Sequence, residues 1–233
     1  MLEKTVKQVE LLPSPWEEGK EKVILIHGLF LYGFIMKPIA RYLIEKGYSP
    51  LLYDYPTMRH TVEDHGEMLA DFLKRYFREG EENGYTGKIH FVTHSMGGII
   101  LRKALSLLSP ADRAKAGHIV MVAPPNKGSD VAKHSLQFLP FPAKYIKPLE
   151  GLSSGEDSYA NKGVMPEEFR ERLGIIGAES DLLVKREYTK LTVCKERIFL
   201  PGHHTPILFK KATFQAILSF LQKGSFPEGL ERV

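Results

Sequence analysis

The sequence predicts an α/β fold in which a parallel sheet of about six strands is flanked by helices. Two observations lead to this class. The chain has 233 residues, 43% of them hydrophobic, which is enough to bury one sizeable core. Short β-branched runs alternate with longer amphipathic stretches. Strands that alternate with helices favour right-handed βαβ units, which bring the carboxyl ends of all the strands to one edge of the sheet.

Six apolar runs are the predicted strands. Each is short and rich in Ile, Val, Leu or Phe, as expected of a strand that is buried on both faces. In chain order the runs are Lys22–Ile26, Tyr48–Tyr53, Lys88–Thr93, His118–Val122, Leu173–Ile176 and Arg197–Leu200.

Helical periodicity predicts the elements between and after these runs. Thr61, with Asp64 three residues later, has the pattern of a capping box at the start of one of them. The predicted helices are Ile35–Glu45, Thr61–Arg78, Gly98–Leu108 and Ala212–Leu221.

A long interval without a strand pattern separates the fourth run from the fifth. From Gly128 to Leu173 the chain is first aromatic and Pro-rich and then has the composition of a loop. Long excursions inside a compact α/β domain are usually lids or binding loops. We therefore expect a single domain over residues 1–233, with an N-terminal extension at 1–21 and a lid or pocket insertion at about 129–172.

Ser95 is the strongest candidate for chemistry, in the segment FVTHSMGG. A predicted strand leads into this serine and a predicted helix leads out of it, which is the context of a nucleophile elbow. Gly97 and Gly98 are small enough for the helix to pass close to neighbouring strands. Thr93 stands where the usual G-x-S-x-G pattern has its first glycine.

The base and the acid that a serine nucleophile needs have candidates after later strands. His203 and His204 follow the sixth run, and periodicity does not choose between them. Asp181 follows the fifth run and is favoured as the acid, with Glu179 beside it and Asp130 after the fourth run as alternatives. The order of serine, acid and histidine is that of a hydrolase.

The end of the first run has the features of an oxyanion-binding turn. His27-Gly28 is followed by Leu29, and the N–H of Leu29 would face the cleft because Gly28 lets the backbone turn tightly. The N–H of Met96 would be the second donor, and Phe30 is a candidate for contact with the substrate. His27 is expected to order this loop rather than to act in chemistry.

Composition excludes several other classes. The 32 basic and 28 acidic residues are nearly balanced, so nucleic acid is not an expected partner. The single cysteine, Cys194, excludes an internal disulfide and a multi-cysteine metal site, and His60 and His65 lack a third ligand. We therefore expect neither a metal nor a cofactor.

No part of the sequence indicates a membrane span or a leader. No window approaches about 18 consecutive apolar residues, and the first residues carry charges throughout. A cytoplasmic location is therefore expected, with transient contact at a membrane surface as the closest association with lipid.

These motifs together resemble the α/β-hydrolases of the lipase and esterase branch, above all the small bacterial lipases and the GPI-inositol-deacylase-like hydrolases. The resemblance extends from about Lys22 to Phe226. The motifs that carry it are VILIHGLF, YDYPTMRHTVED, FVTHSMGGIILRKAL, VMVAPPNKGSD and LPGHHTPILF. It implies a minimal α/β-hydrolase sheet, His204 as the base and Asp181 as the acid.

The expected function is the hydrolysis of acyl esters through an acyl-enzyme on Ser95. The apolar segment 136–152 favours a small-molecule acyl ester or a lipid as the substrate, with Phe138 and Phe141 as candidate contacts for the acyl chain. A thioesterase or acyltransferase with the same triad is the alternative. A hydrolase-like binding protein with a silent site is a third interpretation.

Overall fold

A computed structural model of the chain describes residue 16, residues 19–138 and residues 145–230. Six strands form one parallel sheet in the order β2-β1-β3-β4-β5-β6. Their bounds are β1 Lys22–Ile26, β2 Ser49–Tyr53, β3 Ile89–His94, β4 Ala116–Val122, β5 Leu173–Ala178 and β6 Glu196–Leu200. All six predicted strands are therefore confirmed, with ends that shift by a few residues.

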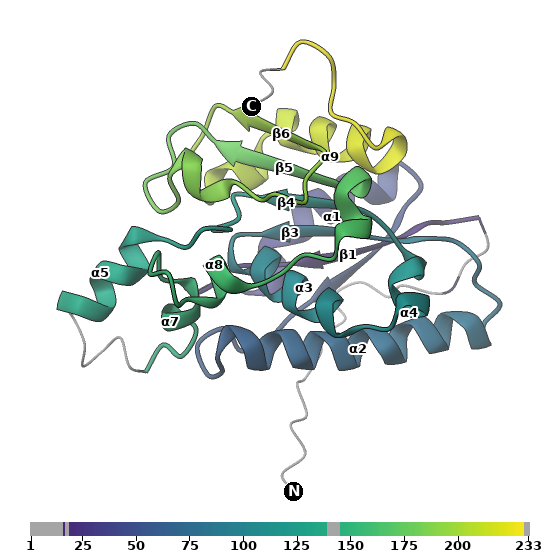
Figure 1. Ribbon diagram of the computed structural model, residues 1–233. Coiled ribbons are helices and arrows are strands. Elements are labelled where there is room, and N and C mark those ends of the chain that lie inside the picture. The colour runs from purple at the N-terminus through teal and green to yellow at the C-terminus, as the bar shows by residue number, and fades with distance from the viewer. Residues whose placement is uncertain (1–15, 17–18, 139–144, 231–233) are drawn as a thin grey trace, which may run out of the picture.

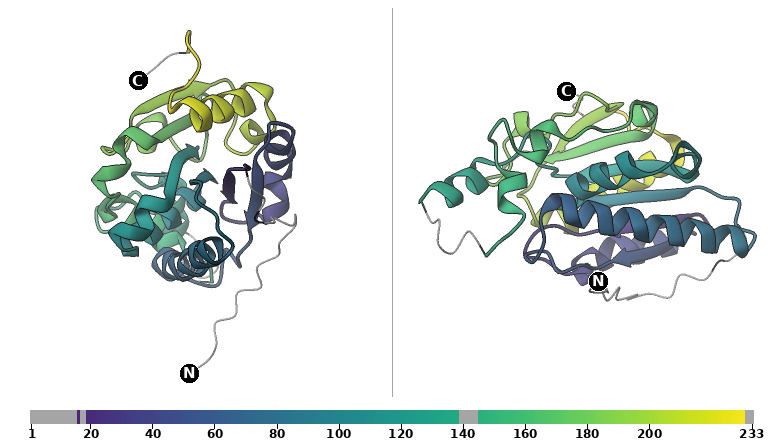
Figure 2. Two further views of the ribbon diagram at one scale, coloured as in Figure 1. Left: turned by 90° about the vertical axis from the view of Figure 1, so that its right-hand side faces the viewer. Right: turned by 60° about the horizontal axis from the view of Figure 1, so that its bottom comes forward.

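Helices cover both faces of the sheet (Figure 1). The helices α2 (Val62–Glu82) and α3 (Met96–Leu107) pack on one face, where Ile24 and Ile26 of β1 point. On the other face, α1 (Lys37–Glu45) and α9 (Lys211–Lys223) pack over Val23 and Leu25. The side chains of β1 alternate between two cores, which is why its sequence is a continuous apolar run. Both views in Figure 2 show the sheet between these two layers.

The predicted capping box is present at the start of α2. The Asp64 N–H donates to Thr61 Oγ1 at 3.1 Å, and the Thr61 N–H donates to Asp64 Oδ2 at 3.2 Å. The helix continues to Glu82, beyond the predicted end at Arg78. The short helix α4 (Pro110–Lys115) was not predicted, although Ser109 caps it and Pro110 is its first residue.

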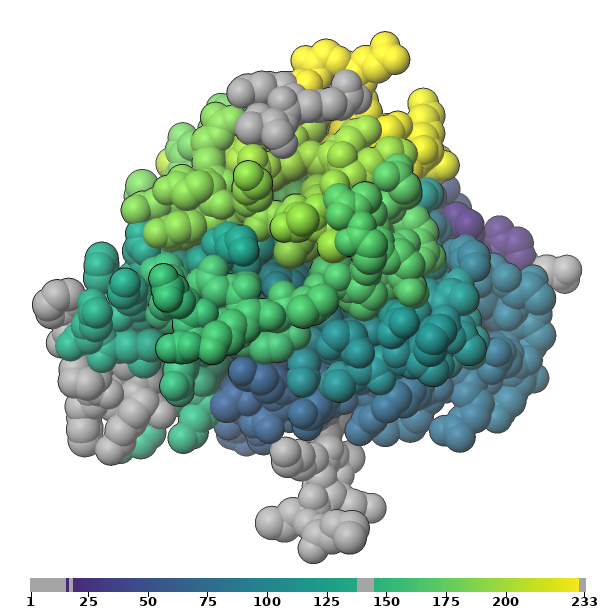
Figure 3. Space-filling view, in the orientation of Figure 1, coloured from purple at the N-terminus to yellow at the C-terminus, as the bar shows by residue number. Residues whose placement is uncertain are grey.

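Short helices fill the interval between β4 and β5. They are α5 (Asp130–Phe138), α7 (Leu149–Leu152), α8 (Tyr159–Lys162) and the 3-10 helix η2 (Glu167–Arg172). Figure 1 places α5 and α7 beyond the edge of the sheet at which the strand arrows end. The segment after α7 lies across the front of the molecule (Figure 3).

One buried arginine attaches this segment to α3. The Arg102 guanidinium donates to the carbonyl oxygen of Ala160 at 3.3 Å and to that of Gly163. It also donates to the Asn126 side chain, in the loop after β4, at 3.2 Å. Burial lowers the pKa of Arg102 to about 10.

Three further 3-10 helices complete the fold: η1 (Gly33–Met36), η3 (Arg186–Thr189) and η4 (Pro206–Phe209). Within residues 16, 19–138 and 145–230, no helix has the length and apolar character that crossing a bilayer requires.

Candidate active site

Ser95 occupies a sharp turn between β3 and α3. Its backbone has φ 52° and ψ −125°, a conformation that L-residues rarely adopt, and its N–H donates to the Val122 carbonyl oxygen at 2.9 Å. A Cβ added at Gly97 would lie 2.6 Å from the carbonyl oxygen of Ile26, so α3 can start this close to β1 only with glycine there. Ser95 therefore has the backbone of a nucleophile elbow.

Thr93 is accommodated in this elbow by Gly98. Its side chain is fully buried, and a Cβ added at Gly98 would lie 3.2 Å from Thr93 Oγ1. The extra volume of a β-branched residue before the serine is thus offset by a missing side chain on the helix. The departure from the usual pattern leaves the strained turn at Ser95 intact.

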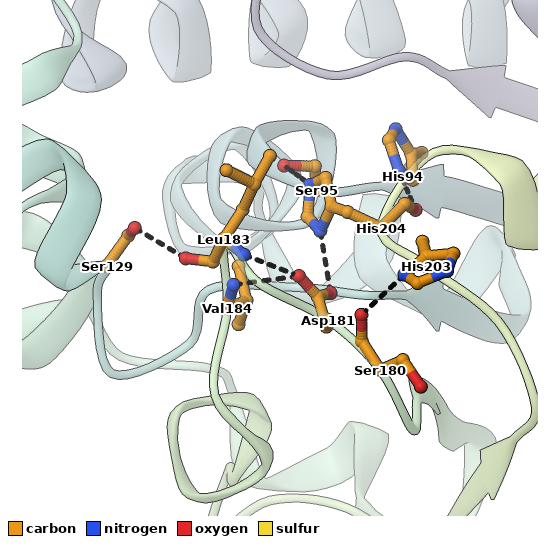
Figure 4. A network of polar contacts seen from close by, with 9 residues as sticks. All are labelled: His94, Ser95, Ser129, Ser180, Asp181, Leu183, Val184, His203 and His204. Carbon is orange, nitrogen blue, oxygen red and sulfur yellow. Dashed lines mark hydrogen bonds and ion pairs between the residues drawn. The ribbon is translucent and has the colours of Figure 1, made fainter.

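The structure brings Ser95, His204 and Asp181 into one hydrogen-bonded chain (Figure 4). The distance from His204 Nε2 to Ser95 Oγ is 2.9 Å, and the distance from His204 Nδ1 to Asp181 Oδ2 is 2.8 Å. A carboxylate can only accept, so the neutral ring carries its proton on Nδ1. Nε2 is then free to accept the proton of the serine hydroxyl.

Two backbone amides hold the Asp181 carboxylate in place. The N–H groups of Leu183 and Val184 each donate to Asp181 Oδ1 at 2.9 Å. Burial pushes the pKa of Asp181 upward, but the hydrogen bond and charge of His204, together with these amides, outweigh it and lower the pKa below its usual value. The side chain is 3% exposed and stays ionised near neutral pH.

The structure distinguishes His204 from the adjacent His203 by the direction of their side chains. His203 is turned outward, and its Nδ1 lies 2.8 Å from the carbonyl oxygen of Ser180 (Figure 4). Its ring therefore contacts the backbone of the loop after β5 and does not face Ser95.

The alternative acids have other roles. Asp130, at the start of α5, contacts Lys185 Nζ at 2.6 Å and accepts from the hydroxyls of Ser154 and Tyr188. The hydrogen bond with Lys185 is the main cause that lowers the pKa of Asp130. This carboxylate ties α5 to the loop after β5. Glu179 is exposed to solvent.

His94 belongs to the site and was not among the predicted residues. It is the last residue of β3, and its buried Nε2 lies 3.0 Å from the His204 carbonyl oxygen, to which it donates. Burial, and then the neighbouring His204, lower the pKa of His94 to about 3, so the ring is neutral. The signal available in the sequence was a histidine directly before the candidate nucleophile.

Gly28 lies directly against the elbow. A Cβ at this position would meet Ser95 Cβ at 2.9 Å and His94 Nδ1 at 3.1 Å. A tight turn does begin at Gly28, since the Leu31 N–H donates to the Gly28 carbonyl oxygen at 3.3 Å, and the left-handed residue of this turn is Phe30, with φ 60°. Gly28 itself is needed for the close approach to the elbow.

Leu29 and Met96, the predicted oxyanion donors, lie on either side of this contact. Leu29 follows Gly28, and Met96 follows Ser95 at the first position of α3. Within the residues that the structure describes, neither backbone N–H is a donor in the turns, loops and caps. Their role as oxyanion donors stays a prediction.

An apolar cavity of about 410 Å³ opens beside Ser95 and His204. Ile146, Leu149 and Leu152 contribute to its wall, as the apolar character of segment 136–152 predicted. Phe30 lies at its rim and is 58% exposed. The described lining contains no Asp, Glu, Lys or Arg side chain. Phe141 and the side chain of Phe138 lie outside the described part of the structure, so their predicted contacts are untested.

The described residues form no metal site of three or more ligands. In the described ranges, no three His, Cys, Asp or Glu side chains are placed to hold one ion. His60 and His65, whose rings are 5.5 Å apart, contact each other edge to face.

A family model described as "Alpha/beta hydrolase family" matches residues 23–194, which is more than half of the chain. No curated protein sequence matches the chain.

Solved structures of similar architecture include a lipase from Bacillus licheniformis in mature form. It is 17% identical with a TM-score of 0.68, and the match covers 88% of this chain and 93% of that one. A monoacylglycerol lipase from Paleococcus ferrophilus is 15% identical, with a TM-score of 0.57 over 88% and 95%. A lipase-esterase related protein from Clostridium acetobutylicum is 18% identical, with a TM-score of 0.57 over 88% and 96%. At these identities the similarity is one of fold.

Proposed function

Because the chain belongs to the alpha/beta hydrolase family, we propose that it is a serine hydrolase of carboxylic esters, similar to lipases and esterases, that works through an acyl-enzyme on Ser95. One observation carries this proposal: the hydrogen-bonded chain from Ser95 through His204 to Asp181 stands at the mouth of an apolar cavity. A nucleophile, a base and an acid are thus aligned where an acyl group could lie.

Acylation begins when Ser95 Oγ attacks the carbonyl carbon of the ester. His204 Nε2 takes the hydroxyl proton, and the Asp181 carboxylate stabilises the imidazolium that results. The N–H groups of Leu29 and Met96 donate to the oxyanion of the tetrahedral intermediate. His204 then gives its proton to the departing alkoxide, so that an alcohol leaves and the acyl group stays on Ser95.

Deacylation repeats these steps with water as the nucleophile. His204 takes a proton from the water as its oxygen attacks the acyl carbonyl carbon. The second tetrahedral intermediate collapses when the Ser95 oxygen leaves and regains a proton from His204. The products are a carboxylic acid and the free enzyme, and no metal or cofactor takes part.

The character of the cavity supports an uncharged acyl group as the part of the substrate that binds there. Ala132, Leu149 and Leu152 form an apolar wall, and the hydroxyls of Ser129 and Ser135 already donate to backbone carbonyl oxygens. A carboxylate or phosphate would lose its hydration in this cavity without gaining a partner. The substrate is therefore a small-molecule acyl ester or a lipid, and the motifs quoted above support a place near the small bacterial lipases and the GPI-inositol-deacylase-like hydrolases.

The test is covalent labelling by a fluorophosphonate together with turnover of p-nitrophenyl esters of graded chain length. Wild-type protein should be labelled and should release p-nitrophenol, whereas Ser95→Ala should lose labelling and about 10⁶-fold in kcat. Retention of near-wild-type turnover by Ser95→Ala contradicts the proposed mechanism. Preference for an acyl-CoA, or transfer to an added alcohol, would instead identify a thioesterase or an acyltransferase. Absence of both labelling and turnover would identify a binding protein.

A further inference from the structure

The loop that carries Leu29 lies beside the loop that follows the neighbouring strand. We call residues 27–33, after β1, the oxyanion loop, and residues 54–57, after β2, the support segment. The register of the parallel pair aligns Ile26 with Tyr53, so the two segments leave the sheet side by side. Contacts between them join positions that are 21 to 28 apart in the sequence.

The support segment holds the start of the oxyanion loop at His27. The Tyr55 hydroxyl donates to the His27 carbonyl oxygen at 2.8 Å, and the two rings stack with centroids 4.5 Å apart. His27 Nε2 lies 2.8 Å from Asp54 Oδ1. The His27 side chain is fully buried, so the strand end is fixed by its backbone and its ring together.

The same carboxylate oxygen holds the end of the loop. The Gly33 N–H donates to Asp54 Oδ1 at 2.7 Å, so one atom connects both ends of the loop. The hydrogen bond with His27 is the largest cause that lowers the pKa of Asp54; burial opposes it, and the Gly33 amide adds to it. The carboxylate is thus ionised near neutral pH and accepts strongly at both places.

Thr57 holds the middle of the loop at its strained residue. Phe30 has φ 60°, a left-handed conformation that a bulky residue adopts only when its surroundings impose it. The Phe30 N–H donates to Thr57 Oγ1 at 3.2 Å. Thr57 is a buried residue, and this hydrogen bond stabilises the strained backbone at Phe30.

The strained turn determines where the Leu29 N–H points. The Leu31 N–H donates to the Gly28 carbonyl oxygen at 3.3 Å, across the turn that Phe30 makes. The Gly28 carbonyl and the Leu29 N–H belong to one planar trans peptide, so they point in opposite directions. Holding the carbonyl toward Leu31 therefore presents the Leu29 N–H on the other side of the loop.

We propose that Thr57 and Asp54 are positioning residues for the oxyanion donor at Leu29. They act through the backbone of the oxyanion loop, and neither side chain lines the cavity beside Ser95. This role rests on the proposed ester hydrolysis, since an oxyanion forms only in such a reaction.

A positioning role makes a kinetic prediction that a purely structural role does not. The oxyanion develops in the transition states of acylation and deacylation and is absent from the bound ester. A misplaced Leu29 N–H should therefore lower kcat and kcat/KM by the same factor and leave KM unchanged. General loosening of the fold would lower the thermal midpoint without that pattern.

The experiment compares Thr57→Val with Thr57→Ser. Valine keeps the shape of threonine and removes the hydroxyl, whereas serine keeps the hydroxyl. We expect Thr57→Val to lower kcat about tenfold or more, less than the roughly 10²–10³-fold loss that follows removal of an oxyanion donor, with KM within about twofold of wild type. Thr57→Ser should restore most of kcat. Asp54→Asn should lower kcat in the same manner, because it weakens the anchor at both ends of the loop.

Ser109→Ala is the matched control. It removes the hydroxyl that caps α4, before β4 and hence at the opposite edge of the sheet. It should lower the thermal midpoint while kcat and KM stay at wild-type values. A wild-type kcat in Thr57→Val, or a loss that Thr57→Ser does not restore, overturns the positioning role. The proposed function still stands in that case, provided that the wild-type protein hydrolyses esters and is labelled by the fluorophosphonate. A wild-type protein that neither reacts with the fluorophosphonate nor hydrolyses esters overturns both.

Discussion

At the scale of single residues, two adjacent histidines in one loop have opposite surroundings. His204 faces Ser95 and Asp181, and its carbonyl oxygen accepts from the neutral His94 ring. His203 lies outside this chain of contacts. The base is therefore held from its side chain and from its backbone at once, which limits the movement of Nε2 relative to Ser95 Oγ.

We predict that His204→Ala loses nearly as much activity as Ser95→Ala, because members of a triad act as a unit; the expected loss in kcat is about 10⁶-fold. His203→Ala should stay within about tenfold of wild type, since its ring is exposed and its Nδ1 contacts the Ser180 carbonyl oxygen. Ester turnover and thermal midpoints of the two variants provide the measurement. The opposite order of severity would transfer the base to His203.

The two candidate acids, Asp181 and Asp130, also differ in their partners. Asp181→Asn should lower kcat by roughly 10⁴-fold, because an amide cannot hold the Nδ1 proton of His204 or stabilise the imidazolium. Asp130→Asn should leave kcat within about tenfold of wild type, since its partners are Lys185, Ser154 and Tyr188. Steady-state kinetics on one ester distinguishes them. A silent Asp181→Asn beside a crippled Asp130→Asn would move the acid to the loop after β4.

At the scale of elements, α5 and α7 form the wall of the apolar cavity. Ala132 on α5 and Leu149 and Leu152 on α7 are buried and line it. The nearby bond from Ser129 Oγ to the Leu183 carbonyl oxygen, at 2.7 Å, ties this wall to the loop that carries Asp181. The insertion between β4 and β5 therefore supplies part of the apolar lining, while the loops that follow β3, β5 and β6 carry Ser95, Asp181 and His204.

We predict that Ala132→Leu shifts the preference of the enzyme toward shorter acyl chains. The larger side chain would fill cavity volume beside α5, and the ratio of kcat/KM for long over short p-nitrophenyl esters should fall about tenfold or more. Lys133→Leu is the control, because this residue is exposed on the same helix and does not line the cavity. An unchanged chain-length profile with a lowered thermal midpoint would show that the wall serves packing alone.

At the scale of the whole molecule, buried neutral histidines make stability depend on pH. Burial is the main cause that lowers the pKa of His65 to about 4 and that of His94 to about 3. In the unfolded chain a histidine has a pKa of about 6.5. The unfolded state therefore takes up protons that the folded state does not as the pH falls below about 6.5.

We predict that the free energy of unfolding is at its full value above about pH 6.5 and falls as the pH drops toward about 4. Each of these histidines contributes a slope of up to about 1.4 kcal/mol per pH unit. Denaturant titrations at several pH values measure the slope. His65→Gln should reduce it, because this variant lacks the buried group whose pKa is lowered. An unchanged slope in His65→Gln would contradict the assignment.

The six strands, their order along the chain and the edge of the sheet at which the site lies could all be predicted from the amino-acid sequence. Strands buried on both faces must be continuous apolar runs, and all six are visible as such. Parallel strands end at one edge, so Ser95, Asp181 and His204 could be placed there from their positions after β3, β5 and β6. The capping box at Thr61 was also visible, because it depends on residues that are three positions apart.

The contacts between side chains in these loops depend on the folded structure. Loops have no period, so periodicity could not separate His204 from His203; the motifs favoured His204 and Asp181, and the hydrogen bonds in the structure connect these two residues to Ser95. The short helices α7 and α8 have four residues each, too few to show a helical period. The contacts of Asp54 and Thr57 with the oxyanion loop arise because β1 and β2 pair in parallel register, which brings together residues that are distant along the chain. These contacts depend on the direction of side chains and on the distance between loops in the folded molecule, neither of which can be read from spacing along the chain.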